Sequence, residues 1–560
     1  MSTRNVITIA SLLLSWQVYA LSVADLTFES GAEASNYSAK GKPSNLYSVA
    51  DTLPQDVLTN VYSMLPEGSV VNSAFIAPDK YSSIDIDDEL NGAEYATARI
   101  TFLNEGAGYR NTLGYFVFDT NNPPTDKDDI DAHIVVFPNA SKPGEGEMQE
   151  GDTIDLGVQL TANQTLAFFL IPNGWGWEGS YNNIANFGNW GTPFYSYPAL
   201  NPETTMEHRR HNVAFLDVQN EFLVLSFEDI KRPSGDNDFN DLIFTVAVTP
   251  FEAIDGVNSD GTTDSKYETL VQENDPDISV TSVYPSSDSM ATIAFEDRWP
   301  LMGDYDFNDV VWSYKITEQI NGQRELTNIT IDYTLQAMGA GYSNGFALQL
   351  PNVDPNNLAS VALTKNGQSV THTVQQASND ETIFIIAEDL RAELSALGGL
   401  PLGCHFYKTD DTCLAMQQGI SLSYQLTVEL TNPVSRDLIG YPPYDPFIFA
   451  SEGEYHGDFV QTPPGMSWQT HMKAFGGTSF MDNALFGLHD DRSGGAQSFL
   501  SENNMPWVIN IRDQWDHPKE LVDITVAYPN FPNWVTSAGE QDSDWYNYAS
   551  ANQVISSSEQ

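Results

Sequence analysis

The sequence predicts a mainly β protein with two β-sandwich-like domains, which an acidic linker joins and one short N-terminal helix precedes. Short apolar runs recur along most of the chain, and turn-rich segments separate them. The composition, with 39 Gly, 30 Pro and 12% aromatic residues, favours short strands and many turns over helical bundles. A length of 560 residues also allows several domains that each bury a sizeable core.

The first 20 residues have the features of a secretory signal peptide. Arg4 supplies a positive charge, residues 6–14 form a short apolar stretch, and small residues around Ala20 offer a cleavage site, with cleavage after Ala24 as an alternative. The apolar stretch is too short to span a bilayer, and no later run of 18 apolar residues predicts a transmembrane segment. We therefore expect an exported protein that is extracellular, at the cell surface or in the periplasm.

The rest of the chain divides into five predicted segments. An N-terminal region at 21–95 contains one helix, predicted by apolar residues at helical spacing: Val57, Leu58, Val61, Tyr62 and Leu65. Strand-like runs at 96–250 predict the first β-sandwich domain. Acidic residues mixed with Gly, Ser, Asn and Thr at 251–282 predict a linker. A second β-rich domain follows at 283–550, and then a tail at 551–560.

The charge balance restricts the partners of this protein. The chain has 24 Lys and Arg residues against 76 Asp and Glu residues, which gives a formal net charge of −52. Such a surface repels phosphate backbones, so we expect no nucleic-acid partner, and anionic membranes are disfavoured for the same reason. Divalent cations are the natural complement of this charge.

The chain contains only two cysteines, Cys404 and Cys413. Their spacing is not the CxxC spacing of redox and metal sites. We expect a disulfide between them, because an oxidising compartment favours one.

One motif occurs twice and carries most of the functional prediction. Phe227-Glu228-Asp229 is followed after six residues by Asp236-Asn237-Asp238-Phe239-Asn240-Asp241. Phe295-Glu296-Asp297 is followed after six residues by Asp304-Tyr305-Asp306-Phe307-Asn308-Asp309. Eight of the nine motif positions are identical at a constant offset of 68 residues. We interpret these segments, called the acidic motifs below, as a duplication.

Each acidic motif is expected to form a hairpin-like unit with its carboxylates gathered at one end. Two like charges about 5 Å apart repel by roughly 3 kcal/mol at an effective dielectric constant near 20, so such a cluster raises its pKa values or recruits a cation. Oxygen ligands at alternating positions suit Ca²⁺, and they suit Mg²⁺ less well because Mg²⁺ resists dehydration. The predicted calcium ligands are Glu228, Asp229, Asp236, Asp238, Asn240 and Asp241 in the first copy, and Glu296, Asp297, Asp304, Asp306, Asn308 and Asp309 in the second.

The acidic motifs have two alternative interpretations. An EF-hand requires Gly where Asp241 stands, and its twelfth position holds Ala247 in the first copy and Lys315 in the second, so the motif is not an EF-hand. The acids could instead cap turns at a solvated rim. In either case we expect Phe239 and Phe307 to be core residues.

A second pair of similar segments supports duplication. Gly106-Ala107-Gly108-Tyr109-Arg110-Asn111 and Gly339-Ala340-Gly341-Tyr342-Ser343-Asn344 each precede a strand-like run. A dinucleotide-binding fingerprint needs a third glycine at the last position, where both copies have Asn. We predict that these segments, called the glycine motifs below, are tight turns inside paired strands.

These motifs resemble two families of secreted bacterial proteins. Residues 97–250 resemble an uncharacterised domain with a Gly-Ala-Gly-Tyr start and an acidic end; the matching stretches are 104–116, 136–141, 172–175 and 227–244. Residues 283–550 are similar to the LruC-type domain, through the stretches 294–314, 340–350, 445–448, 505–507 and 520–534. The resemblance implies an exported, β-rich, envelope-associated or extracellular protein with a calcium role, and it implies no particular reaction.

The sequence thus favours a non-enzymatic, calcium-binding surface or matrix protein with an adhesive or glycan-binding role. Its expected partner is an extracellular glycan or matrix component, and the sequence does not identify any protein partners. Candidate glycan-binding residues come from an aromatic-rich segment: Trp175, Trp177, Trp190 and Tyr195. The alternative for this segment is that its rings pack a long loop onto the sandwich. The alternative function is a secreted hydrolase acting on polysaccharide, in which some carboxylates would perform acid–base chemistry.

Overall fold

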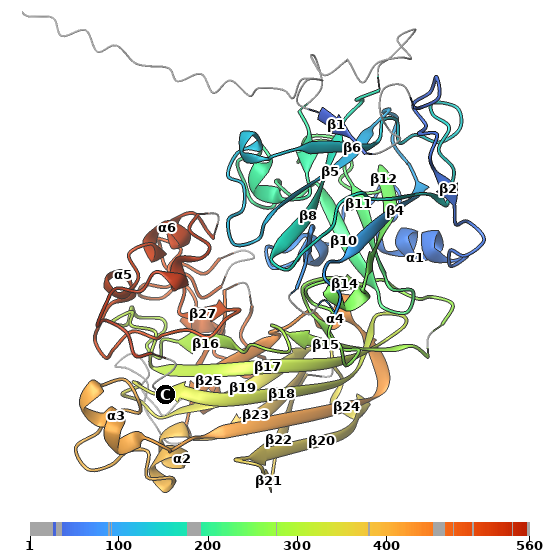
Figure 1. Cartoon of the computed structure of the whole chain (residues 1–560). Helices are drawn as coiled ribbons and strands as arrows, with labels where there is room; N and C mark the ends of the chain where they lie inside the picture. Colours follow the sequence, from blue (N-terminus) through green and yellow to red (C-terminus); the bar gives the residue numbers. More distant parts are fainter. Residues whose placement is uncertain are drawn as a thin grey trace, which may run out of the picture.

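The computed structural model describes residues 26–29, 36–87, 90, 92–175, 192–275, 277–378, 381–451, 465–473, 475–494, 498–539 and 541–556. The fold is mainly β, as the sequence predicts, and the strands form two sandwiches (Figure 1). The predicted signal peptide at 1–20 lies outside the described residues.

The first sandwich consists of a six-stranded and a seven-stranded sheet. The six-stranded sheet contains β1 (Leu26–Phe28), β3 (Ile84–Asp85), β5 (Thr112–Asp119), β6 (His133–Phe137), β8 (Gln164–Ile171) and β9 (Phe194–Tyr195), in the order β1-β6-β5-β8-β3 with β9 paired to β8. The seven-stranded sheet contains β2 (Tyr47–Ser48), β4 (Thr97–Asn104), β7 (Asp152–Asp155), β10 (Asn212–Asp217), β11 (Phe222–Phe227), β12 (Leu242–Thr249) and β14 (Glu268–Thr269), in the order β14-β10-β11-β12-β4-β7-β2.

The core of this sandwich lies between the two sheets. Successive residues of a strand point to opposite faces, so each strand contributes alternate apolar side chains to the core. Phe168 of β8 and Phe244 of β12 meet there with ring centroids 5.3 Å apart. The outer face of the seven-stranded sheet is covered by helix α1 (Val57–Met64), which buries Val57 and Val61 one turn apart. The predicted N-terminal helix is therefore confirmed.

The second sandwich has a nine-stranded and a five-stranded sheet. The larger sheet contains β13 (Thr263–Asp264), β15 (Ser279–Tyr284), β16 (Ala291–Phe295), β17 (Val310–Asn321), β18 (Glu325–Ala337), β20 (Leu358–Lys365), β21 (Gln368–Val370), β24 (Ser423–Ser435) and β27 (Val508–Ile511). Its order is β13-β15-β17-β18-β24-β20-β21, and β16 pairs with β17 and β27. The smaller sheet contains β19 (Asn344–Pro351), β22 (Thr373–Ser378), β23 (Glu381–Ala387), β25 (Asp445–Ala450) and β26 (Gln469–Thr470), in the order β22-β23-β19-β25-β26.

Aromatic side chains fill the core of the second sandwich, and short helices lie outside its sheets. Trp312 of β17 stacks on Phe346 of β19 across the two sheets, with ring centroids 4.8 Å apart. The helices are α2 (Leu390–Ala396), α3 (Asp411–Gln417), α4 (Arg436–Ile439), α5 (Ile524–Ala527) and α6 (Phe531–Thr536). Helices α5 and α6 lie beside β16 and β27 (Figure 1) and pack on the outer face of the nine-stranded sheet. The expected disulfide joins Cys404 to Cys413.

The segment predicted as a linker, 251–282, contributes strands to both sandwiches through its described residues, 251–275 and 277–282. Strand β14 pairs with β10 of the first sandwich, while β13 and β15 pair with each other in the second. Acidic composition suggested a solvated segment, but Asp264 and Glu268 are both buried. They are held by hydrogen bonds and ion pairs, which composition alone does not reveal.

Candidate cation sites

Each acidic motif connects two antiparallel strands that are neighbours in a sheet. Strand β11 ends at Phe227, which pairs with Leu242 at the start of β12. Strand β16 ends at Phe295, which pairs with Val310 at the start of β17. The predicted hairpins are therefore present, and their ligand candidates lie in the connecting loops, 228–241 and 296–309.

Both loops adopt the same unusual backbone. The second and fourth residues of each aspartate run are left-handed, with φ values of 58° and 60° at Asn237 and Phe239, and of 53° and 48° at Tyr305 and Phe307. This conformation is costly for residues other than glycine and persists only where surrounding contacts impose it. Both phenylalanines are fully buried, as the sequence predicts, and their packing opposes that cost.

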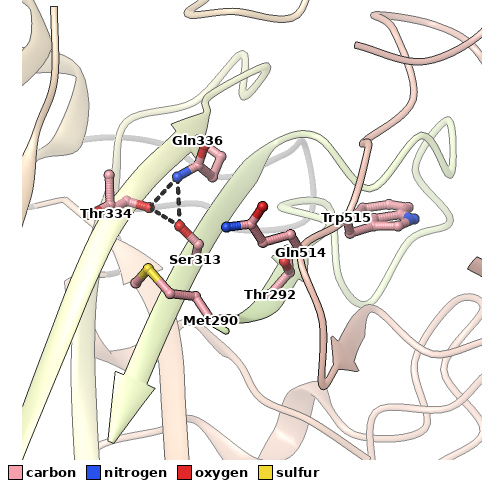
Figure 2. A pocket seen from close by; sticks show the side chains of 7 residues that line it. All are labelled: Met290, Thr292, Ser313, Thr334, Gln336, Gln514 and Trp515. Atoms are coloured by element: carbon pink, nitrogen blue, oxygen red, sulfur yellow. Dashed lines mark hydrogen bonds between the residues drawn. The ribbon is translucent and has the colours of Figure 1, made fainter. Parts of the chain in front are cut away.

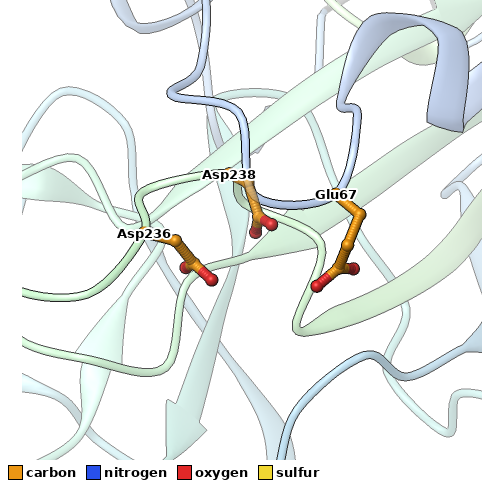
Figure 3. Close-up of side chains that lie close together, drawn as sticks. All are labelled: Glu67, Asp236 and Asp238. Carbon is orange, nitrogen blue, oxygen red and sulfur yellow. The ribbon is translucent and has the colours of Figure 1, made fainter.

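In the first copy, Asp236 and Asp238 meet a third carboxylate. Each of Asp236, Asp238 and Glu67 offers one oxygen, and these oxygens lie within 4.8 Å of one another. Figure 3 shows that the two aspartates come from the acidic loop, whereas Glu67 comes from the segment near α1. Asp238 is buried, while the other two side chains are exposed, so the group opens to solvent on one side.

Glu228 is fully buried and lies close to Asp236 and Asp238. Neither of its carboxylate oxygens has a hydrogen-bond partner within the described chain. Burial and the nearby charge of Asp236 raise the pKa of Glu228 to about 8, and the Phe239 amide, which opposes this shift, does not reach hydrogen-bonding geometry. An ionised carboxylate without a partner is costly to bury. The Glu228 side chain therefore requires either a proton or a nearby positive charge.

In the second copy, oxygens of Glu296, Asp304 and Asp306 lie within 4.8 Å of one another. Glu296 is fully buried; its Oε1 accepts a hydrogen bond from the Phe307 amide at 2.7 Å, but its Oε2 has no partner within the described chain. Burial and the charge of Asp304 raise the pKa of Asp306 to about 8. Both copies therefore have a buried glutamate near two aspartates, but Glu296 is itself one of the three converging carboxylates, whereas Glu67 takes that place in the first copy.

The remaining aspartates of each motif close the loop at its base. The Asp229 amide donates to Oδ2 of Asp241 at 2.8 Å, and the Asp297 amide donates to Oδ2 of Asp309 at the same distance. Burial and the charge of Asp229 raise the pKa of Asp241 to about 9, and burial and the charge of Asp297 raise that of Asp309 well above its usual range. These four carboxylates sit next to the clusters described above without belonging to them.

The glycine motifs contact the acidic motifs. Their flanking strands lie in opposite sheets of each sandwich, β4 and β5 in the first and β18 and β19 in the second, so the predicted turns inside paired strands are wrong. The last residue of each motif bonds to an acidic loop: Asn111 Nδ2 donates to Asp229 Oδ2 at 2.7 Å, and Asn344 Nδ2 donates to Asp297 Oδ2 at 3.1 Å. Sequence reasoning missed this contact, although the parallel duplication of both motifs was a usable signal.

The first glycine of each glycine motif makes room for an asparagine of the acidic loop. A Cβ atom on Gly106 would lie 2.8 Å from Asn240 Oδ1, and one on Gly339 would lie 1.9 Å from Asn308 Oδ1. Any larger residue would therefore displace the asparagine. Both asparagines are buried, and Asn308 Oδ1 has no hydrogen-bond partner within the described chain.

Two of the four candidate glycan-binding residues are buried. Trp175 is fully buried and packs edge-on against Tyr37, with ring centroids 5.4 Å apart. Tyr195 is 2% exposed, and its hydroxyl lies 3.1 Å from Nε2 of His133. Neither ring is free to stack on a sugar, because both are buried in an apolar cluster on the outer face of the six-stranded sheet. Trp177 and Trp190 lie outside the described residues.

A pocket on the second sandwich is lined by uncharged side chains. Figure 2 shows its lining: Met290, Thr292, Ser313, Thr334, Gln336, Gln514 and Trp515. Its volume is about 170 Å³, below the usual range for ligand sites, and Gln336 donates to Ser313 Oγ at 2.6 Å. None of the seven residues is acidic, His or Cys.

Within the described residues, no helix is both long and apolar enough to cross a membrane.

Two families match parts of the chain. A family described as Domain of unknown function (DUF4114) matches residues 160–249, and one described as Domain of unknown function (DUF4842) matches residues 324–546. Neither description carries the LruC name, so that resemblance stays a prediction. No curated protein matches the chain. Among solved structures, a Bacteroides ovatus protein provisionally described as a lipoprotein is 14% identical, with a TM-score of 0.40; the match covers 62% of this chain and 92% of that one.

Proposed function

We propose that this protein is an exported, calcium-binding, non-enzymatic β-sandwich protein of the cell surface or extracellular matrix. One observation carries the proposal. In both hairpins a fully buried glutamate, Glu228 or Glu296, has a carboxylate oxygen without a hydrogen-bond donor and lies beside two further carboxylates. A divalent cation would satisfy these oxygens and cancel their mutual repulsion.

The ligand chemistry favours Ca²⁺ over other metals. The converging groups are carboxylate oxygens, which are the hard donors that Ca²⁺ takes in sets of six to eight. We assign Glu228, Asp236 and Asp238 to the first site and Glu296, Asp304 and Asp306 to the second. Asp229, Asp241, Asp297 and Asp309 shape the loops from below through their bonds to the backbone.

The proposed location gives these sites a role. Extracellular calcium modules bind with dissociation constants of about 10⁻⁴–10⁻³ M, so an exported protein of this kind is loaded outside the cell. Binding at two loops that each join strands of a sandwich would rigidify a scaffold. An adhesive or glycan-binding role fits such a scaffold, and its partner would be an extracellular glycan or matrix component.

The proposal is tested by calorimetric titration of calcium into chelator-treated mature protein. We expect two binding events per chain and a melting temperature that rises more in calcium chloride than in sodium chloride of equal ionic strength. Binding to the folded state alone stabilises it by about 2.7 kcal/mol per site at a hundredfold excess over Kd. Identical melting curves in the two salts would contradict calcium binding, because they would reduce the effect to screening.

A further inference from the structure

A third duplicated element lies against the acidic loops, and it comes from segments remote from them in the chain. Residues 66–69 and 519–522 each form a turn, closed by the Ser69 amide donating to the Pro66 carbonyl at 3.0 Å and the Val522 amide donating to the Lys519 carbonyl at 2.9 Å. The third residue of each turn is left-handed, with φ of 67° at Gly68 and 60° at Leu521. We call these two segments the capping turns.

Each capping turn bonds to the second aspartate of its acidic motif. The Gly68 amide donates to Asp238 Oδ2 at 2.7 Å, and the Leu521 amide donates to Asp306 Oδ2 at 2.8 Å. Asp238 and Asp306 are corresponding residues of the duplication. A backbone donor from outside the motif therefore reaches the same carboxylate in both copies.

A second bond, from the backbone three residues further along the chain, follows just after each turn. The Val71 amide donates to the Asn237 carbonyl at 2.8 Å, and the Ile524 amide donates to the Tyr305 carbonyl at 2.7 Å. Asn237 and Tyr305 are again corresponding residues. Two bonds at the same spacing to the same two positions make the capping turns structural counterparts, although they lie near opposite ends of the chain.

Both capping turns carry a glutamate immediately before the left-handed residue. Glu67 places an oxygen within 4.8 Å of oxygens of Asp236 and Asp238. The second glutamate, Glu520, has a buried Oε2 without a hydrogen-bond partner within the described chain. A Cβ atom on Gly339 would lie 2.8 Å from this Oε2 and 1.9 Å from the equally unpartnered Oδ1 of Asn308, so two acceptors face the same space.

The capping turns are continuous with the helices that cover the acidic motifs. Helix α1 ends shortly before Glu67, and helix α5 begins shortly after Glu520. Residues of α1 and Phe239 belong to one apolar cluster, and Phe307 packs against Phe531 of α6 with ring centroids 6.0 Å apart. An interaction that fixes a capping turn therefore also restrains the neighbouring helices, α1 in the first sandwich and α5 and α6 in the second.

We infer that Glu67 and Glu520 are further calcium ligands, so that each site is completed by a remote segment that the cation fastens to its acidic loop. The inference rests on the proposed function. Without a cation, the glutamate of each turn faces carboxylates of the same sign, and the turn is held by its backbone bonds and apolar contacts. A bound cation attracts both the glutamate of the turn and the carboxylates of the acidic loop, so it holds the two segments together.

The test uses chelator-treated mature protein and the variants Glu67→Gln and Glu520→Gln, which keep side-chain size and remove one charge. Calorimetric titration with calcium should show one of the two sites weakened at least tenfold in each variant, while the other site is unchanged. Glu94→Gln and Glu502→Gln, which change exposed glutamates in the same halves of the chain, are the controls and should bind as the unmodified protein does.

Hydrogen exchange separates ligation from a merely structural role. Calcium should slow exchange of the amides at 68–71 and 521–524 in the unmodified protein, and Glu67→Gln should abolish the slowing only in the first segment. If both variants bind calcium like the unmodified protein, the inference is wrong and the proposed function stands. If the unmodified protein binds no calcium, the proposed function fails and the inference fails with it.

Discussion

At the residue scale, the acidic loops combine features that destabilise a protein when taken alone. Asn237 and Phe239 occupy left-handed backbone conformations, and Glu228 is buried without a hydrogen-bond donor. Strain of this kind costs on the order of 1–3 kcal/mol per residue and concentrates where function demands a fixed geometry. Its repetition at the same positions of the second loop shows that the two loops share one backbone conformation.

The central aspartates should decide the response to calcium. We expect Asp238→Asn and Asp306→Asn, each alone, to remove about half of the calcium-induced rise in melting temperature, and the double variant to remove most of it. The physical reason is that each change deletes a charged ligand oxygen from one site. Differential scanning calorimetry with calcium or chelator measures this. Asp288→Asn, at an exposed position, should keep the full rise.

The left-handed residues of the capping turns allow a second test at this scale. A Cβ atom on Gly68 would contact nothing within 4 Å, so Gly68→Ala adds backbone strain without a clash. We expect it to lower the free energy of unfolding by about 1 kcal/mol. Leu521 is 74% exposed and already carries this strain, so Leu521→Gly should be neutral or slightly stabilising. Denaturant unfolding compares the two, and a stabilising Gly68→Ala would contradict the argument.

At the element scale, three short segments meet at each site in a different chain order. In the first sandwich the order is capping turn, glycine motif, acidic motif; in the second it is acidic motif, glycine motif, capping turn. The same contacts form in both cases, because the glycine motif crosses between sheets and the acidic motif joins neighbouring strands of one sheet. The site is therefore a property of sandwich geometry and not of chain order.

The motif phenylalanines should link the acidic loops to their helical cover. Phe307 is fully buried against the C-terminal helices, so Phe307→Ala should cost about 3–5 kcal/mol and loosen residues 524–536. Limited proteolysis and denaturant unfolding measure the two effects. Phe307→Leu should cost less, since it leaves a smaller cavity. Equal protease resistance of the Ala variant and the unmodified protein would show that the helices are held independently of the loop.

At the scale of the whole molecule, a buried ion cluster joins the two sandwiches. Glu268 of β14 pairs with Arg436 at 2.9 Å, with Arg324 at 3.2 Å and with Lys80 at 3.5 Å. Arg436 also pairs with Glu318 of β17 at 3.1 Å. The chain has only 24 Lys and Arg residues, and three of them gather in this cluster. Their ion pairs with buried glutamates connect the first sandwich to the second.

Removing the central acid should weaken this connection in a pH-dependent way. Burial alone would raise the pKa of Glu268, but Arg436, Lys80 and Arg324 hold it at about 2, below its ordinary value of 4.5. The stabilisation is therefore present above pH 4.5 and is lost as the pH falls towards 2. We expect Glu268→Gln to cost about 3–5 kcal/mol at neutral pH, because it leaves buried cations unpaired.

The measurement is the difference in unfolding free energy between the unmodified protein and Glu268→Gln across this pH range. The difference should shrink below pH 4.5. Glu393→Gln is the matched control: its partner Lys365 lies 2.6 Å away, but both side chains are partly exposed, so the cost should stay below about 1 kcal/mol. A Glu268→Gln difference that does not change with pH would contradict the assigned ionisation.

The strand-rich fold, the helix near residue 60 and the acidic hairpins could be predicted because each depends on local sequence. Alternating apolar residues and turn residues predict strands, and a motif that bridges two strand-like runs predicts a hairpin. The prediction failed where it relied on local composition and the outcome depended on tertiary contacts. Residues 251–282 seemed solvated, but Glu268 is buried in ion pairs, and the glycine motifs seemed to be turns inside paired strands, but they cross between sheets.

The sequence by itself determined the β-rich character, the excess negative charge and the two clusters of candidate ligands, since these follow from residue type and spacing. Only the tertiary structure decided which carboxylates converge, that Trp175 and Tyr195 are buried, and that the turns carrying Glu67 and Glu520 bond to the acidic loops. The capping turns share little more than a glutamate and a β-branched residue four positions later, which is too little to detect along a chain. Their equivalence arises from backbone bonds to distant loops, and such bonds depend on how the sheets and their covering helices pack in space.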